Sequence, residues 1–330
     1  ALLPFTNGNL PATAPSHSPT DEAEPPAPRR PLFSHRLPIC MPPASDPSAL
    51  TAQGTAAYRQ QIEEAAETLL NALPSAPTIG ILYAPSLGSP LADKTVTHSL
   101  PYGDLPHVPT APTADGTIQV GAVEGTTVAA LPQPLHLYDG HTAREVTFPV
   151  RLLATTGVHT LLLAGTAESV SPQFGSGDVM LLTDHINFQG QNPLVGPNVE
   201  DWGPRFPDMT APYNASLQRA AGDVARNIGT PLRKGIYLSR LGPEDETSAE
   251  HRMARRLGAN AVGAGLVPEV IAARHMDVSV LALALLTREH SPDSSTPTPL
   301  VDDRALDTAR SRLRRLLRGI VAQAELDDAS

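Results

Sequence analysis

Cysteine, aromatic residues and positive charge are all scarce in this chain of 330 residues. The single cysteine, Cys40, excludes any disulfide within the chain, although it does not by itself identify the cellular compartment. Aromatic residues make up 4% of the sequence, and 24 lysines and arginines face 34 aspartates and glutamates, which gives a net charge of −10. A nucleic-acid-binding surface needs a basic face that neutralises phosphates, so this charge balance argues against such a partner.

Long hydrophobic runs are also missing. Because no stretch of 18 apolar residues is present, the sequence predicts no segment that spans a membrane. The first residues show neither the basic region nor the apolar region of a signal peptide. We therefore expect a cytoplasmic protein without a membrane partner.

Proline, in contrast, is abundant and unevenly spread. Of the 35 prolines, 12 fall within residues 1–50, where serine, threonine and glutamate fill much of the remaining sequence. Proline lacks a backbone donor and disfavours helix in the residue before it. The pattern predicts an extended or disordered tail over 1–50 and a folded domain over 51–330. Docking of the apolar residues in 31–43 on the domain, or binding of the tail to a partner's aromatic groove, are alternatives.

Helical and strand patterns alternate along the rest of the chain, and several strands are apolar on both faces. This alternation predicts an α/β domain with a mostly parallel or mixed sheet that helices cover on two sides. Helices are expected at 55–73, 143–156, 214–227, 247–257, 268–273 and 300–326, and strands at 78–83, 118–123, 127–131, 160–164, 179–183, 235–241, 261–265 and 278–286. The sequence TSAE at 247–250 predicts a capping box at Thr247, and Glu124-Gly125 between two short strands predicts a hairpin.

Six motifs follow one another in register. They are HLYDG at 136–140, VTFPVR at 146–151, the segment 184–198 that begins DHIN, RFPDMTAPY at 205–213, GPEDETSAE at 242–250 and VPEVIAARH at 267–275. Together they resemble the trimeric-class purine nucleoside phosphorylases and methylthioadenosine phosphorylases, as a diverged member. The resemblance implies a single α/β domain with a mixed, partly closed central sheet flanked by helices, usually assembled as a homotrimer.

Enzymes of that family displace the purine of a nucleoside by phosphate, through a transition state with oxocarbenium character. The resemblance therefore implies a phosphate subsite, a ribose subsite and a base subsite that takes up charge on the leaving group. Glu246 matches the glutamate that accepts hydrogen bonds from the purine, although an acid here would also complement the following helix dipole. His136 matches a histidine of the phosphate subsite and is, with Glu246, an expected catalytic residue. The expected substrate-binding positions are Tyr138, Asp139, Thr166, Ala167, Phe188, Asp245, Ala264, Thr287 and Arg288.

Several of these positions depart from the family's pattern. Arg288 stands where the family has asparagine or aspartate, and a guanidinium offers only donors. Asp245 and Ala264 replace an aromatic residue and a methionine, and Asp139 replaces a glutamate. Phe188 lies in a shortened loop and corresponds to an aromatic residue that serves the neighbouring subunit. We expect a base pocket that differs from the family's in charge and shape.

The expected phosphate subsite departs further from the family's pattern than the base pocket does. Pro85 replaces the serine of the glycine-rich loop, which removes a hydroxyl and an amide from an anion cradle. Pro134 replaces an arginine, and Ala114 replaces a histidine. Ser86 and Gly265, the latter in place of a serine, remain as candidate phosphate-binding residues.

The expected phosphate subsite also gains a negative charge. Glu168 belongs to the segment 165–169, which we expect to be a loop beside the site. Since an arginine–phosphate pair is a strong, charge-assisted interaction, its loss predicts poor phosphate binding unless Arg144 or Arg288 reaches the site.

Three functions remain open from the sequence. The preferred one is a diverged enzyme that binds a nucleoside-like or other small ligand and performs glycosyl transfer or hydrolysis. A non-catalytic relative that binds or scaffolds a partner is the alternative, and a purine nucleoside phosphorylase with a rearranged phosphate site is the second. Retention of His136, Tyr138, Glu246 and Thr287 favours a ligand site. We expect no cofactor, and no metal site, because no histidine pair at i, i+4 comes with a third ligand.

Overall fold

The computed structural model describes residues 51–92, 95–110, 116–289 and 302–328, with side chains up to residue 324. The predicted tail of residues 1–50 and the position of Ala114 lie outside these ranges. Among the helices that are described, none is both long and apolar enough to cross a lipid bilayer.

Six α-helices occur in the described residues, close to the predicted ones. Thr142 and Thr247 each begin a helix with a capping box, in which the threonine side chain and the glutamate three residues later bond each other's backbone amides. The capping box predicted at Thr247 is thus confirmed. The helices are α1 (Ala52–Asn71), α2 (Ala143–Thr155), α3 (Ala215–Asn227), α4 (Ser248–Arg256), α5 (Val267–His275) and α6 (Asp303–Asp328).

Nine strands form one sheet in the order β2-β3-β4-β1-β5-β8-β7-β6-β9. The segment 165–169 is part of a strand and not the expected loop, because β5 continues through it in pairing with β9. The sequence pattern did not indicate β2. The strands are β1 (Ile79–Tyr83), β2 (Val96–Pro101), β3 (Thr117–Val123), β4 (Thr126–Pro132), β5 (Thr160–Ser169), β6 (Val179–Asn187), β7 (Leu232–Ser239), β8 (Ala261–Gly263) and β9 (Ser279–Glu289).

The sheet is mixed and partly closed, as predicted. β5 pairs in parallel with β1 over residues 160–164, and then pairs with β8 at residues 168 and 169. On its other side β5 pairs with β9 along its whole length. Because β9 also pairs with β6, β6 with β7, and β7 with β8, these five strands close into a ring. The strand β5 therefore leaves the open part of the sheet and enters the ring at residues 165–167.

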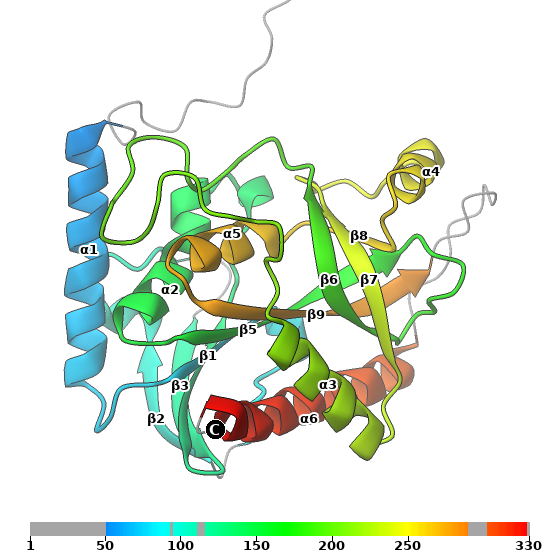
Figure 1. The fold of residues 1–330 in the computed structure, drawn as a ribbon, viewed down its shortest axis with the longest axis horizontal. Coiled ribbons are helices and arrows are strands. Elements are labelled where there is room, and N and C mark those ends of the chain that lie inside the picture. The colour runs from blue at the N-terminus through cyan, green and yellow to red at the C-terminus, as the bar shows by residue number, and fades with distance from the viewer. Residues whose placement is uncertain (1–50, 93–94, 111–115, 290–301, 329–330) are drawn as a thin grey trace, which may run out of the picture. The chain divides into compact units, whose positions relative to one another are not determined.

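Helices cover the sheet on two sides and create two large apolar cores (Figure 1). One core joins α1, α2 and α5 to the sheet through residues such as Ile62, Phe148 and Val270. The other joins α3 and α6 through residues such as Leu217 and Leu313. Each fully buried side chain of this size contributes about 1.5–3 kcal/mol. The two cores hold the strand ends around which the candidate site is built.

Candidate functional site

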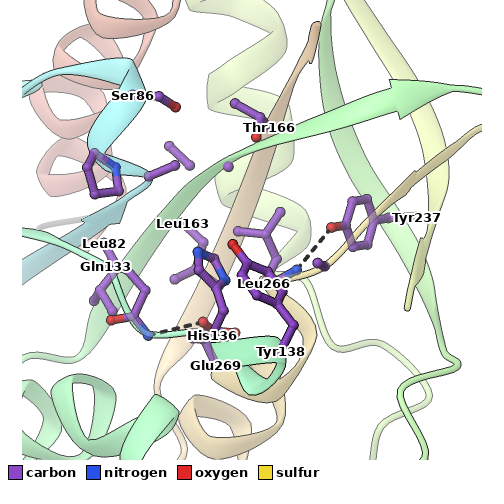
Figure 2. A pocket seen from close by; sticks show the side chains of 16 residues that line it. Leu82, Ser86, Gln133, His136, Tyr138, Leu163, Thr166, Tyr237, Leu266 and Glu269 are labelled. Carbon is purple, nitrogen blue, oxygen red and sulfur yellow. Dashed lines mark hydrogen bonds between the residues drawn. The ribbon is translucent and has the colours of Figure 1, made fainter. Parts of the chain in front are cut away.

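A cavity of about 280 Å³ lies beside the point where β5 changes its partner from β1 to β8. Its wall comes from the end of β1 and the turn after it, the middle of β5, the turn before α2, and the segment that leads into α5 (Figure 2). Ligands of α/β proteins commonly bind beyond the carboxyl ends of strands, where neighbouring strands part. The sheet topology thus creates a ligand-sized cavity at the expected place.

His136 and Tyr138 form one wall of the cavity. A single 3₁₀ turn, η4 (Leu137–Asp139), stacks their rings with centroids 4.6 Å apart and planes 10° from parallel. Burial lowers the pKa of His136, and the nearby Asp139 partly opposes this effect. The imidazole is therefore neutral at pH 7, and it does not replace a permanent cation.

Most backbone amides of the turn that follows β1 already donate hydrogen bonds to backbone carbonyls of the protein. The amides of Ala84, Leu87 and Gly88 donate to backbone carbonyls over 2.8, 2.9 and 3.1 Å. Pro85 has no amide hydrogen. In this described turn, Ser86 alone has both an amide and a hydroxyl that form no hydrogen bond within the turn, and it lines the cavity. An anion cradle needs several converging amides, which this turn does not provide.

The described part of the cavity wall carries no permanent positive charge. Among the described residues that line it, none is lysine or arginine. Arg144 donates to the Thr55 hydroxyl of α1 over 2.8 Å, and Arg288 pairs with Asp245. Arg144 and Arg288 were the two candidates to replace the arginine that is lost at Pro134, and neither lies in the cavity wall. Arg314 of α6 does not line the cavity, but its Nη1 donates to the carbonyl of Leu87 in the turn after β1 over 2.9 Å.

Glu269 gives the cavity wall a buried carboxyl group. This residue lies in the first turn of α5 and is 3% exposed. Its Oε1 accepts a hydrogen bond from Gln133 Nε2 over 3.2 Å, and Gln133 also lines the cavity. Burial raises the pKa of Glu269 to about 7, against an ordinary value of 4.5. A group of this kind changes its charge near neutral pH, as a proton-transfer residue requires.

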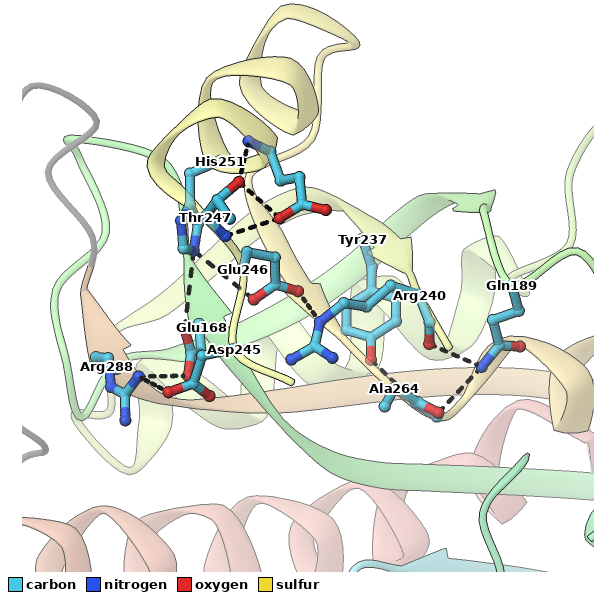
Figure 3. Close-up of polar contacts among 12 residues, drawn as sticks. Glu168, Gln189, Tyr237, Arg240, Asp245, Glu246, Thr247, His251, Ala264 and Arg288 are labelled. Carbon is cyan, nitrogen blue, oxygen red and sulfur yellow. Dashed lines mark hydrogen bonds and ion pairs between the residues drawn. The ribbon is translucent and has the colours of Figure 1, made fainter. Parts of the chain in front are cut away.

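A second group of polar residues, which we call the charge cluster, gathers six ionisable side chains at the ends of β5, β7 and β9 and the start of α4 (Figure 3). Three carboxylates lie among two guanidinium groups and one imidazole, so the charges nearly cancel. The charge cluster consists of Glu168, Arg240, Asp245, Glu246, His251 and Arg288.

The pair Arg240–Glu246 occupies the side of the charge cluster nearest the cavity. The two side chains form an ion pair and are 20% and 7% exposed. A Cβ on Gly242 would lie 2.8 Å from Arg240 Nη1, 3.5 Å from the Tyr138 ring and 3.8 Å from Ala264. Gly242 also has a φ of +76°, so both its conformation and the guanidinium favour glycine here. Gly242 thus lies beside both the Arg240 guanidinium and two residues of the cavity wall, Tyr138 and Ala264.

Arg288 holds the opposite side of the charge cluster. Its Nη1 lies 2.9 Å from Asp245 Oδ2 and 3.3 Å from Glu168 Oε1. The hydrogen bond from Arg288 lowers the pKa of Asp245, which keeps this carboxylate ionised. Nη1 of Arg288 thus binds acidic side chains of the protein itself.

His251 completes a set of atoms with the spacing of a cation site. One atom each of Glu168, Glu246 and His251 lie within 4.8 Å of one another, and the imidazole Nε2 is 3.9 and 3.8 Å from the two carboxylates. Arg240 and Arg288 already compensate these carboxylates, so a metal ion would have to compete with both ion pairs. The observed chemistry of the charge cluster is that of an ion-pair network.

Comparisons with known proteins agree with this architecture. The sequence pattern of the phosphorylase superfamily matches residues 80–322. Purine nucleoside phosphorylase 1 of Bacillus subtilis is 37% identical over 273 residues, which are 81% of this chain and 100% of that protein. The bovine purine nucleoside phosphorylase is 33% identical over 264 residues, which are 78% of this chain and 91% of that protein. The chain belongs to the purine nucleoside phosphorylase family.

Solved structures of this family show the same fold. A Schistosoma purine nucleoside phosphorylase in complex with hypoxanthine superimposes with a TM-score of 0.74 at 29% identity, over 80% of this chain and 96% of that one. The Schistosoma mansoni enzyme in complex with inosine gives a TM-score of 0.73 at 26% identity over the same shares.

The structure separates the residues that the family resemblance pointed to. Asp245, Glu246 and Arg288 belong to the charge cluster and do not line the cavity. Thr287 lies next to Arg288 of the charge cluster, and its hydroxyl donates to the carbonyl of Ala167 over 3.3 Å. Asp139 and Phe188 lie on exposed surface outside the cavity wall. Those that line the cavity are Ser86, His136, Tyr138, Thr166, Ala264 and Gly265.

Sequence reasoning missed four functional candidates: Gln133, Arg240, His251 and Glu269. Glu269 carried one signal, since an acid within the otherwise apolar VPEVIAA segment must be buried with its helix. The other three are brought to the site only by the tertiary fold.

Proposed function

We propose that this protein binds a nucleoside or nucleoside-like ligand in the cavity and that inorganic phosphate is not its co-substrate. The observation that carries the proposal is the cavity wall itself, in which the described residues provide no lysine or arginine and Glu269 provides an acid. The turn after β1 supports the proposal, because most of its backbone amides already donate to carbonyls and cannot also bind phosphate. A doubly charged anion in such a wall would lack the charge-assisted hydrogen bonds that normally hold it.

The base of the ligand is proposed to present hydrogen-bond acceptors to the protein, as the O6 and N7 atoms of inosine do. In the family, the glutamate at the position of Glu246 accepts hydrogen bonds from the purine. Here Arg240 already pairs with that carboxylate, and Arg288 offers donors where the family has an amide or a carboxylate. A ligand with acceptors on its edge suits these guanidinium groups better than a purine that donates.

The test adds inosine, adenosine and methylthioadenosine separately, with and without inorganic phosphate, and follows both Tm and release of free base. We expect at least one nucleoside to raise Tm, and phosphate to change neither Tm nor the rate of release. Phosphate-dependent release at ordinary enzymatic rates, about 1–10³ s⁻¹, would refute the proposal. If no nucleoside changes Tm, the non-catalytic alternative gains support.

A phosphorylase with a rearranged phosphate site is the second candidate function, and Arg314 favours it. This guanidinium donates a hydrogen bond to the carbonyl of Leu87 in the turn after β1. If the Arg314 guanidinium turned into the cavity and bound phosphate, Arg314→Gln would abolish phosphate-dependent release of the base. We expect instead that Arg314→Gln leaves the response to phosphate unchanged.

We also propose that the protein assembles as a homotrimer. Phe188, Val195 and Phe206 are large apolar side chains that are 52%, 54% and 87% exposed. Val195 and Phe206 line one shallow depression of the surface. Exposed apolar residues grouped in this way are typical of interfaces. Light scattering should give the mass of three chains, and Phe206→Asp should give a smaller particle.

A further inference from the structure

Glu269 in the first turn of α5 is unusual because it is buried, whereas most acids in the first turn of a helix are exposed. The helix is apolar around it, and its neighbours Val267, Pro268 and Val270 are all buried. Burial of a carboxyl group is costly unless hydrogen bonds or charges compensate it. Among the described residues no cation forms an ion pair with Glu269, and its carboxyl group interacts with the backbone amide of Glu269 itself and with the side chain of Gln133.

The orientation of Gln133 is fixed, so it cannot satisfy both carboxyl oxygens. Its Nε2 donates to the carbonyl of Val146 in α2 over 2.6 Å and to Glu269 Oε1 over 3.2 Å. The amide nitrogen is thereby used, and the carbonyl oxygen points elsewhere. As a result Glu269 Oε2 and Gln133 Oε1 are both buried without a hydrogen-bond partner in the described part of the chain.

These two oxygens are acceptors, and the residues that hold them border the same cavity. Buried polar atoms in native proteins nearly always have a partner, so each unpaired one calls for a donor. Among the residues that line the cavity, the other titratable side chains are His136, Tyr138 and Tyr237, and none of them bonds Glu269. The missing donor must therefore enter through the cavity, as water or as part of a ligand.

We propose that Glu269, held in place by Gln133, is the general base that takes a proton from a water molecule as this water attacks the anomeric carbon of a bound nucleoside. The inference rests on the proposed function, since it needs a nucleoside in the cavity and no phosphate. The water oxygen forms a bond to the anomeric carbon, and the bond from this carbon to the base nitrogen breaks. The leaving base keeps the electron pair and is protonated by solvent, and Glu269 later returns its proton to solvent. The products are free base and ribose.

The surroundings of Glu269 suit this role in two further ways. The raised pKa of Glu269 makes the carboxylate a better proton acceptor near pH 7 than an exposed glutamate is. A carboxylate also stabilises the positive charge that develops on the sugar in an oxocarbenium-like transition state. The arginine-free wall, which disfavours phosphate, leaves this negative charge uncompensated and available to the sugar.

The test uses the full chain with inosine in phosphate-free buffer and compares Glu269→Gln with Glu67→Gln. Glutamine has the same shape, carries no charge and can still accept the hydrogen bond from Gln133 Nε2, so the variant should fold, which its Tm checks. Glu67 lies on the exposed face of α1 and provides a matched control. We measure ribose and hypoxanthine release, kcat and KM, together with the rise of Tm that inosine causes.

We expect the wild type and Glu67→Gln to release ribose, and Glu269→Gln to lose at least about 100-fold in kcat with little change in KM. A Glu269→Gln variant with the kcat of the wild type overturns the proposal. A wild type whose Tm rises with inosine but which releases no ribose also overturns it, while nucleoside binding stands. If inosine, adenosine and methylthioadenosine all leave Tm unchanged, the proposed function itself fails.

Discussion

Replacing Glu269 by glutamine should stabilise the protein at pH 8 far more than at pH 5. Burial raises the pKa of Glu269 in the folded state to about 7, against an ordinary value of 4.5 that the unfolded chain retains. Between these two values the folded state keeps a proton that the unfolded state has lost, so stability falls as pH rises through this window. The penalty is absent below pH 4.5 and complete above pH 7.

The size of the effect follows from the two pKa values. Each pH unit between them is worth about 1.4 kcal/mol, so the buried carboxylate costs roughly 3 kcal/mol at pH 8. At pH 5 the cost is below about 1 kcal/mol by the same relation. Glutamine has the same shape and no charge, so it removes the penalty. For a domain of this length, 3 kcal/mol corresponds to an increase in Tm of roughly 5–10 °C.

Thermal unfolding of the wild type and Glu269→Gln at pH 5 and pH 8 measures this difference. His136, which lines the same cavity, is present in both proteins, so its contribution cancels in the comparison to a first approximation. Tyr237 stays protonated at both pH values, because burial raises the pKa of its phenol. A Tm difference that is equal at the two pH values would refute the reasoning, because it would show that the Glu269 carboxyl does not titrate differently in the folded state. A less stable variant at pH 8 would refute it as well.

Three further variants test other parts of the site. Arg240→Met leaves the buried Glu246 without its guanidinium, so Tm should fall by several degrees, and inosine should then raise Tm more than in the wild type. A Cβ on Gly265 would meet only the His136 ring, at 3.9 Å, so the double variant Gly265→Ser, Pro134→Arg should fold and should gain a rise of Tm with inorganic phosphate. Thr247→Ala removes the capping box of α4 and should cost about 1 kcal/mol in urea unfolding, without a change in nucleoside binding.

The sequence predicted those parts of the fold that depend on local patterns. The hairpin of β3 and β4 and the capping box at Thr247 are encoded within a few residues, and both are found in the structure. β2 escaped prediction because its side chains alternate between half-buried and exposed and include few large apolar residues. The extension of β5 escaped because its residues Gly165–Ser169 are small or polar, and pairing with β9 makes them a strand.

The candidate site was less predictable because tertiary contacts decide it. The family motifs identified Glu246, but they did not show that Arg240 would pair with this carboxylate. The apolar VPEVIAA segment signals that Glu269 is buried, but only the packing of α5 reveals that Gln133 lies beside its carboxyl group. Charge neutralisation and burial depend on residues that are distant in sequence, so motif spacing alone cannot reveal them.

The ring of five strands also limits how copies of this chain can associate through their backbones. An open sheet presents two edges with unpaired backbone groups, and each edge can add a strand from another molecule. Here β9 has partners on both sides, so in the described residues the edge that remains at the end of the sheet is β2. This strand has six residues and ends at Pro101, which has no backbone donor to offer. Intermolecular strand addition is therefore restricted to one short edge, and the strands around the cavity are protected from it.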